Sequence, residues 1–176
     1  KIPTLDLLEV CGLGKLDPTA STQAFIILLP KGKVAFLVNK VIDVVRISLS
    51  DVIDVPNYAL PRAALFTGAL PKSVLPAADA LRKSILASQL LVLNSTALQT
   101  DTQISALADV VTVDQTKARQ YRTASAGNEG GDRKRNMITY LLGSETASPF
   151  EQIREILPFT PDIPIFEQTG PMLGMI

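Results

Sequence analysis

The chain has 176 residues, of which 47% are hydrophobic and 19% are charged, so it is long and apolar enough to fold around a core. Its 17 basic and 17 acidic residues balance, which leaves no overall field to attract nucleic acid or an anionic membrane. The absence of histidine removes the usual general base and nearly excludes a zinc site, so we expect neither a metal nor a cofactor.

The two ends of the chain carry strand-like apolar runs, Lys1–Leu7 and Pro171–Ile176. A short turn joining the second run back to the first would make one hairpin, so we expect the two ends to be neighbours in space. Gly12 follows a cluster of leucines, which predicts a short helix that Gly12 ends. The only cysteine, Cys11, cannot form an internal disulfide, which fits a reducing cytosol, and we expect it to be a buried core residue.

The middle of the chain carries most of the strand signals. Turn residues at 30–32 separate two apolar runs, which predicts a β-hairpin. The run before the turn is apolar throughout, so we expect that strand to be buried on both faces. The strands predicted in this part of the chain are Ala24–Leu29, Val34–Val38, Val41–Leu49, Leu65–Leu70 and Leu90–Leu93.

The rest of the chain mixes helical, irregular and strand signals. Proline in the first turn and one apolar face predict a helix over Pro76–Ala87, and the first half of Asp101–Gln120 has a similar pattern. The polar, glycine-rich segment Lys117–Arg135 predicts a flexible linker. A strand is expected at Met137–Leu142, and the segment Ser148–Glu151 has the form of a capping box, which predicts a single helical turn.

Two sets of charged residues can be explained either by a function or by simple exposure to solvent. The run 133–135 (Arg-Lys-Arg) could contact nucleic acid, but beside a glycine-rich segment of a neutral chain it is better explained as solvated. Asp43, Asp51 and Asp54 could bind a hard cation or act in acid–base chemistry, but they lack the spacing of a calcium loop and are expected to be exposed. The sequence gives no positive evidence for catalysis, so we do not expect an enzyme.

A series of motifs emerges when the chain is taken in a rotated order, with residues 136–176 before residues 1–100. The rotated chain opens with Met137-Ile-Thr-Tyr-Leu-Leu-Gly143 and continues with Phe150-Glu-Gln-Ile-Arg-Glu-Ile156. Its later segments are Gly32-Lys-Val-Ala-Phe-Leu-Val-Asn-Lys-Val-Ile-Asp-Val-Val45, Phe66-Thr-Gly68 and Leu90-Leu-Val-Leu-Asn-Ser95. In their order and spacing, these segments resemble the CheW-like domain of bacterial chemotaxis.

The resemblance implies a fold and a division of the chain. Residues 1–100 would be the C-terminal part of a CheW-like domain, residues 136–176 its N-terminal part, and residues 101–135 a helical or flexible linker. A circular permutation, a fragment spanning two tandem repeats, or missing residues would each explain the rotation. The expected fold is mainly β, with two SH3-like five-stranded β-barrel subdomains and a few short helices.

The resemblance also implies a non-catalytic adaptor in chemotaxis signal transduction, located in the cytoplasm at receptor arrays. Its partners would be the regulatory domain of a histidine kinase and the cytoplasmic tip of a chemoreceptor, and a domain-swapped homodimer is a further expectation. No apolar run reaches the roughly 20 residues of a membrane-spanning helix, so direct membrane insertion is not expected. The alternative is a β-barrel ligand-binding or enzymatic domain with an internal pocket.

The family's receptor groove lies between the two barrels and suggests which residues of this chain contact a partner. The candidate partner-binding residues carried over from the family are Val38, Asn39, Lys40, Val41, Ile153, Arg154 and Gly174. The three apolar side chains are expected to belong to the core, and the three polar ones to lie at the surface. The chain lacks the arginine of the receptor-contact loop that Gly174 would adjoin.

Overall fold

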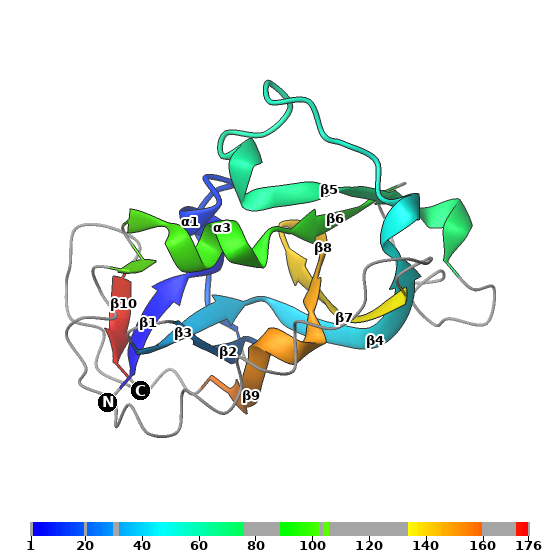
Figure 1. Ribbon diagram of the computed structural model, residues 1–176. Helices are drawn as coiled ribbons and strands as arrows, with labels where there is room; N and C mark the ends of the chain where they lie inside the picture. Colours follow the sequence, from blue (N-terminus) through cyan, green and yellow to red (C-terminus); the bar gives the residue numbers. More distant parts are fainter. Residues whose placement is uncertain are drawn as a thin grey trace.

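Two five-stranded sheets make up the described part of this chain (Figure 1). The computed structural model describes residues 2–19, 21–29, 32–75, 89–102, 104–105, 134–159 and 172–175. The first sheet has the strand order β10 (Met172–Met175), β1 (Pro3–Asp6), β3 (Lys33–Val38), β2 (Gln23–Leu28) and β9 (Ile153–Pro158). The second sheet has the order β4 (Lys40–Ser48), β7 (Lys134–Leu142), β8 (Ser144–Pro149), β6 (Gln89–Leu93) and β5 (Phe66–Pro71).

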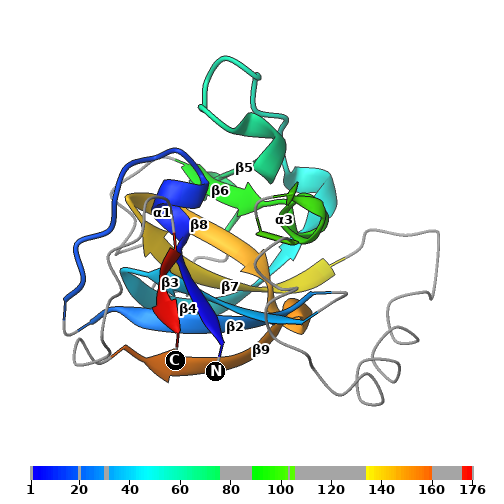
Figure 2. The same cartoon turned by 90° about the vertical axis from the view of Figure 1, so that its left-hand side faces the viewer.

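The helices in these ranges are short. They are α1 (Leu7–Val10), α3 (Ser95–Thr100) and the 3₁₀ turns η1 (Leu49–Asp51), η2 (Ala63–Leu65), η3 (Lys72–Val74) and η5 (Phe150–Gln152). Both α1 and α3 lie above the first sheet in two views at right angles (Figures 1 and 2). Across the described ranges, none of the helices has the length and apolar character that crossing a bilayer requires. The expectation of a mainly β fold with few short helices is confirmed.

The first and last strands of the chain are partners. β1 pairs with β10 in antiparallel register, with Pro3 opposite Met175 and Thr4 opposite Gly174. The chain ends marked N and C lie beside each other in both views (Figures 1 and 2). The expectation that these two terminal segments are neighbours is therefore confirmed.

A single residue carries the chain from one sheet to the other. β3 ends at Val38 in the first sheet, and β4 begins at Lys40 in the second, so Asn39 alone joins them. The Asn39 N–H donates to the Leu141 carbonyl (3.1 Å), and its side-chain Oδ1 accepts from the Gly143 N–H (3.4 Å). Leu141 belongs to β7, and Gly143 lies in the turn between β7 and β8. These two hydrogen bonds therefore hold the crossing to the second sheet.

The two sheets share one apolar core. The ring of Phe25 on β2 meets the ring of Tyr140 on β7 edge-on, with centroids 4.9 Å apart and planes at 84°. Such an edge-to-face pair adds about 1 kcal/mol to the hydrophobic gain from burying both rings. The Tyr140 hydroxyl is fully buried and is satisfied by the Ser148 hydroxyl at 2.6 Å. The packing between sheets therefore leaves no unpaired polar atom at the contact of these two rings.

The second sheet also encloses a smaller core of its own. All of its strands contribute to this cluster, whose buried residues are Val45, Ile47, Leu70, Leu75, Leu90, Val92, Met137 and Ala147. Beyond η1, Ile53 returns to pair with Ala69 on β5, through two backbone hydrogen bonds of 2.8 Å. This isolated bridge links the continuation of β4 to the opposite edge of the sheet. The sheet is thus curled around its core, although the strands do not form a closed barrel.

The N-terminal turn is organised by a buried aspartate. The side chain of Asp6 is fully buried and accepts from the N–H groups of Leu8 (2.9 Å), Glu9 (3.2 Å) and Leu16 (2.7 Å). It therefore caps α1 and also holds the loop that follows. The helix ends in a Schellman motif, with Gly12 at φ 69° and its N–H donating to the Glu9 carbonyl. The prediction that Gly12 ends a short helix is confirmed.

The strand predictions within the described ranges are confirmed, with shifts of a few residues at their ends. The single helical turn predicted at Ser148–Glu151 is present as η5, but Ser148 is not its cap. It lies at 5% exposure in β8 and bonds to Tyr140, while η5 follows without a side-chain cap. β7 begins at Lys134, so the last two residues of the expected linker are strand residues. The rest of that segment, the helix expected at 76–87 and most of the helix expected at 101–120 lie outside the described residues.

Gly68 on β5 leads to a testable prediction. A Cβ atom added there would lie 2.4 Å from the Ile53 carbonyl oxygen and 2.7 Å from Cγ1 of Val52. We expect Gly68→Ala to lower the free energy of unfolding by about 2 kcal/mol, because the bridge between Ile53 and Ala69 must open. Urea unfolding measures the change.

Thr67 provides the matched control, since it lies next to Gly68 on the same strand but its side chain is exposed. Thr67→Ala should change the free energy of unfolding by less than about 0.5 kcal/mol. Equal stability of the Gly68 variant and the wild type would show that the bridge does not constrain β5.

Candidate partner-binding surface

Four of the candidate residues follow one another at the crossing between the sheets. Val38 is fully buried, Lys40 is exposed, and Asn39 and Val41 are half-buried. The Val41 N–H donates to Oε1 of Gln23 at 2.8 Å, so a side chain of the first sheet holds the start of β4. Of these four side chains, Lys40 is the most accessible to a partner. The Val38 side chain is buried and cannot contact a partner directly.

Ile153 and Arg154 begin β9, at one edge of the first sheet. Ile153 lies opposite Ile27 on β2 and is half-buried against the shared core, and Arg154 is exposed. Val38 lies opposite Gln23 on the same β2 strand, four residues away from Ile27. At the usual rise of a strand, this separation is about 13 Å along the sheet.

Gly174 lies on β10, at the other edge of the first sheet, where it faces Thr4 of β1. Four strand spacings separate β10 from β9, which is about 19 Å across a flat sheet. The candidate residues are therefore spread from edge to edge instead of gathering in one place. Their role in binding a partner stays a prediction.

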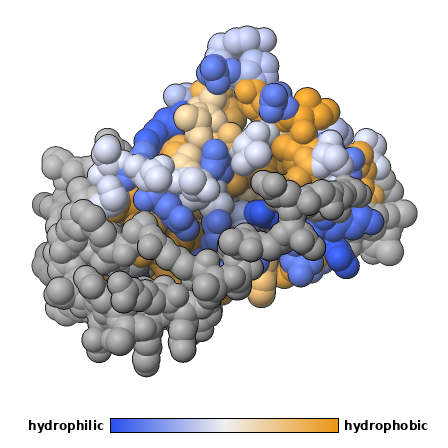
Figure 3. Space-filling view, in the orientation of Figure 1, coloured by the Kyte–Doolittle hydropathy of each residue, from blue (hydrophilic) through white to orange (hydrophobic). Residues whose placement is uncertain are grey.

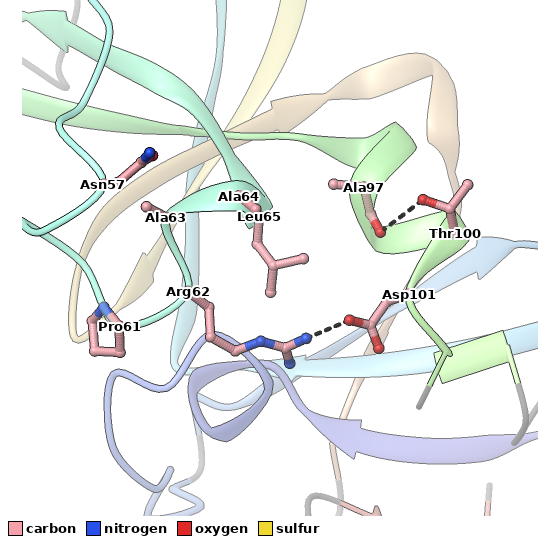
Figure 4. Close-up of a pocket in the computed structure, with 9 residues that line it drawn as sticks. All are labelled: Asn57, Pro61, Arg62, Ala63, Ala64, Leu65, Ala97, Thr100 and Asp101. Carbon is pink, nitrogen blue, oxygen red and sulfur yellow. Dashed lines mark hydrogen bonds and ion pairs between the residues drawn. The ribbon is translucent and has the colours of Figure 1, made fainter.

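A second surface feature was not predicted from the sequence. A cavity of about 540 Å³ opens at the surface between the segment that precedes β5 and the helix α3 (Figure 4). Its lining residues are Asn57, Pro61, Arg62, Ala63, Ala64, Leu65, Ala97, Thr100 and Asp101. Its lining combines three alanines, Pro61 and Leu65 with the polar side chains of Asn57, Arg62, Thr100 and Asp101. Prolines at 56 and 61 favour an irregular backbone in this segment, but no sequence motif indicates a cavity.

An ion pair fixes one wall of this cavity. The guanidinium of Arg62 pairs with the Asp101 carboxylate and also donates to the Val10 carbonyl at 2.7 Å (Figure 4). The Asp101 side chain is only 10% exposed, and it also accepts from the Ile104 N–H at 3.3 Å. Arg62 thus ties the segment before β5 to the end of α1 and to the residue that follows α3.

The residue before α3 explains where this helix begins. Oδ1 of Asn94 accepts from the Ala97 N–H at 3.1 Å, which caps the first turn. Leu98 is buried in the shared core and Ala97 packs against it, so two apolar side chains and one cap hold the helix in place. An asparagine followed by Ser-Thr-Ala was the available sequence signal for this helix, which our sequence analysis did not predict.

Burial controls the titration of two side chains near this wall. Desolvation raises the pKa of the Cys11 thiol from 9.0 to about 12, although the positive charge of Arg62 lowers it in part. Desolvation also raises the pKa of Tyr140, against the opposing effect of its hydrogen bond with Ser148. Both groups are neutral at physiological pH, and Cys11 is buried as expected.

The acidic residues singled out in the sequence do not form a site. Asp43, Asp51 and Asp54 are all exposed. Among the described residues, no group of three or more histidine, cysteine, aspartate or glutamate side chains could hold a metal ion.

Comparison of the chain with protein-family models, with curated proteins and with solved structures finds no match. None of these comparisons identifies a CheW-like domain. The relation to that family stays a prediction.

The ion pair beside the cavity predicts a specific loss of stability. Asp101→Asn keeps an oxygen that can accept from the Ile104 N–H but removes the charge that faces Arg62. We expect the free energy of unfolding to fall by about 1–2 kcal/mol, because a charge-assisted hydrogen bond is lost. The loss stays small because Arg62 is partly exposed and water screens its charge. Chemical unfolding of this variant and of Asp54→Asn, an exposed control, tests the expectation. Equal effects of the two substitutions would contradict it.

The buried thiol predicts how stability depends on pH. Above pH 9.0 the unfolded chain loses the Cys11 proton, while the folded chain keeps it up to a pKa of about 12. The free energy of unfolding should therefore fall as the pH rises through this window. Cys11→Ala should make the fall shallower when unfolding is measured at pH values of about 8 and about 10. An unchanged pH dependence in this variant would show that the thiol is accessible in the folded chain.

Proposed function

We propose that this protein is a CheW-like adaptor in rotated order, which couples chemoreceptors to a histidine kinase. The observation that carries the proposal is the antiparallel pairing of β1 with β10. In the rotated order these two strands follow each other, so the pairing makes them the arms of one hairpin. The sequence resemblance and this pairing support the same arrangement.

The distribution of strands supports the proposal further. Starting from β7, the rotated order is β7, β8, β9, β10, β1, β2, β3, β4, β5 and β6. The first sheet then takes five consecutive strands, and the second sheet takes the first two and the last three. This distribution fits a domain of two five-stranded subdomains, in which the second sheet contains strands from both ends of the rotated chain. In the proposal, each sheet is an incompletely closed counterpart of an SH3-like barrel, and the curled second sheet with its own core favours this view.

The proposed partners are the regulatory domain of a chemotaxis histidine kinase and the cytoplasmic tip of a chemoreceptor, met in the cytoplasm at receptor arrays. The exposed Lys40 at the crossing between the sheets is the side chain best placed for such a contact. Binding would depend mainly on apolar and backbone contacts, because the chain has no net charge. Exchange of β10 between two copies would give the domain-swapped homodimer of this proposal.

A binding experiment tests the adaptor function. Purified chain is titrated with the kinase regulatory domain and with a receptor cytoplasmic fragment from the same organism. We expect Lys40→Glu to weaken binding by about threefold to tenfold, as loss of an exposed charge contact does. Circular dichroism should report an unchanged fold, because the Lys40 side chain is exposed.

Lys134→Glu is the matched control, since Lys134 is also exposed but lies opposite Ser48, at the far end of β4 from Lys40. It should bind as the wild type does. Absence of wild-type binding to either partner would contradict the adaptor function, and an equal effect of both charge reversals would contradict the placing of the contact at Lys40.

A further inference from the structure

Two segments that are far apart in the sequence meet at one leucine side chain. A Cβ atom added to Gly143, in the turn between β7 and β8, would lie 3.1 Å from Cδ1 of Leu8. A Cβ atom added to Gly14, in the loop after α1, would lie 3.8 Å from Cδ2 of the same leucine. Leu8 is buried, whereas both glycines are exposed. We call Leu8, Gly14 and Gly143 the glycine junction.

Both segments are held in place where they meet. On one side, the Asp6 carboxylate accepts from the N–H groups of Leu8 (2.9 Å) and Leu16 (2.7 Å), which fixes the loop after α1. On the other side, Gly143 has a φ of 70° and its N–H donates to Oδ1 of Asn39 at 3.4 Å. The junction is therefore formed before any partner arrives, and little conformational entropy is lost on binding.

A lysine adjoins each side of the junction. Lys15 comes directly after Gly14, and Lys40 comes directly after Asn39, whose side chain holds Gly143. Both lysines are exposed, and neither forms an ion pair with a carboxylate of the described residues. Two ammonium groups that are free to meet a partner therefore flank the exposed backbone of the glycines.

Most carboxylates close to the junction in the chain are withdrawn from the surface. The side chains of Asp6 and Glu145 are buried, and that of Glu9 is half-buried. Asp17, two residues after Lys15, is exposed and opposes the lysines in part. The charged groups that a partner can touch here are thus two ammonium groups and one carboxylate.

Apolar contacts do not single out another surface in the described part of the chain. The exposed large apolar side chains lie on five separate segments and are Val44, Ile53, Tyr58, Val74 and Phe150. Figure 3 shows hydrophilic residues between the hydrophobic areas of one face. Charge and access to the backbone therefore distinguish the glycine junction.

We propose that the glycine junction and its two lysines bind an acidic segment of a protein partner. Carboxylates of this segment would pair with Lys15 and Lys40, while its backbone lies over glycines that have no side chains to hold it off. Two lysines in a chain of zero net charge are too few for nucleic acid, which needs many phosphate contacts. As an extension of the contact at Lys40, the inference rests on the proposed function.

A peptide titration followed by NMR tests this surface without the kinase or the receptor. The isotope-labelled full chain is titrated with a short peptide that alternates glutamate with glycine, and then with its glutamine counterpart. We expect the amides of Gly14, Lys15, Lys40 and Gly143 to shift with the glutamate peptide, with a dissociation constant of about 1 mM. The glutamine peptide should shift them much less, and salt at about 500 mM should suppress the shifts.

Charge variants give the expected direction of each effect. Lys15→Glu and Lys40→Glu should each weaken binding of the glutamate peptide by at least about threefold, and Asp17→Asn should strengthen it by about twofold. Lys134→Glu is the matched control at the far end of β4 and should bind as the wild type does. All four side chains are exposed, so circular dichroism should report an unchanged fold.

Several outcomes would overturn the proposal. These are equal shifts with both peptides, shifts that lie away from Gly14 and Gly143, and undiminished binding by Lys15→Glu. A DNA oligonucleotide that shifts the same amides at a lower concentration than the peptide would overturn it in favour of nucleic acid.

The adaptor function can fail separately from this surface. A chain whose junction binds the glutamate peptide, but which binds neither the kinase domain nor the receptor fragment, keeps the surface and loses that function. Where those partners do bind, Lys15→Glu should weaken their binding as Lys40→Glu does. An unchanged affinity of Lys15→Glu for them would contradict the inference and leave the adaptor function standing.

Discussion

The arrangement of this protein depends on a crossing that is one residue long. Because Asn39 alone joins β3 to β4, the two sheets must meet there and diverge, and their facing sides must share one core. The Asn39 N–H donates to β7, and its Oδ1 accepts from the Gly143 N–H in the turn that follows β7. The Val41 N–H donates to Gln23 of the first sheet, so the crossing is held to both sheets. The contact of Phe25 with Tyr140 follows from that constraint, since it lies where the two sheets face each other.

The sheets are also linked by how they recruit strands. Each pairs segments from both halves of the chain: β9 and β10 complete the first sheet, and β7 joins β4 in the second. Neither sheet can therefore be removed from the other as a continuous piece of chain. In our proposal the rotated order explains this interdependence most simply, because rotation makes the paired strands β10 and β1 consecutive.

Strands were predictable from the sequence where an apolar run was compatible with only one type of secondary structure. The all-apolar run at 24–29 could only be a buried element, and its length favoured a strand. Local pattern failed where a polar side chain had a distant partner. Ser148 has the spacing of a cap, but it forms a hydrogen bond with Tyr140 of the neighbouring strand instead.

The cavity beside α3 could not be predicted from the sequence either, since it depends on Arg62 reaching Val10 and Asp101. The candidate binding residues came from a family pattern, and no periodicity could have revealed their spread across the first sheet.

The sheet order has a consequence for synthesis on the ribosome. In the completed fold, β2 is covered on one side by β9 and β1 by β10, both of which come from the end of the chain. Until those residues leave the exit tunnel, β2 and β1 each keep an open edge that another chain can join. The nascent protein is therefore most exposed to aggregation in the interval when β1 and β2 have emerged and β9 and β10 have not.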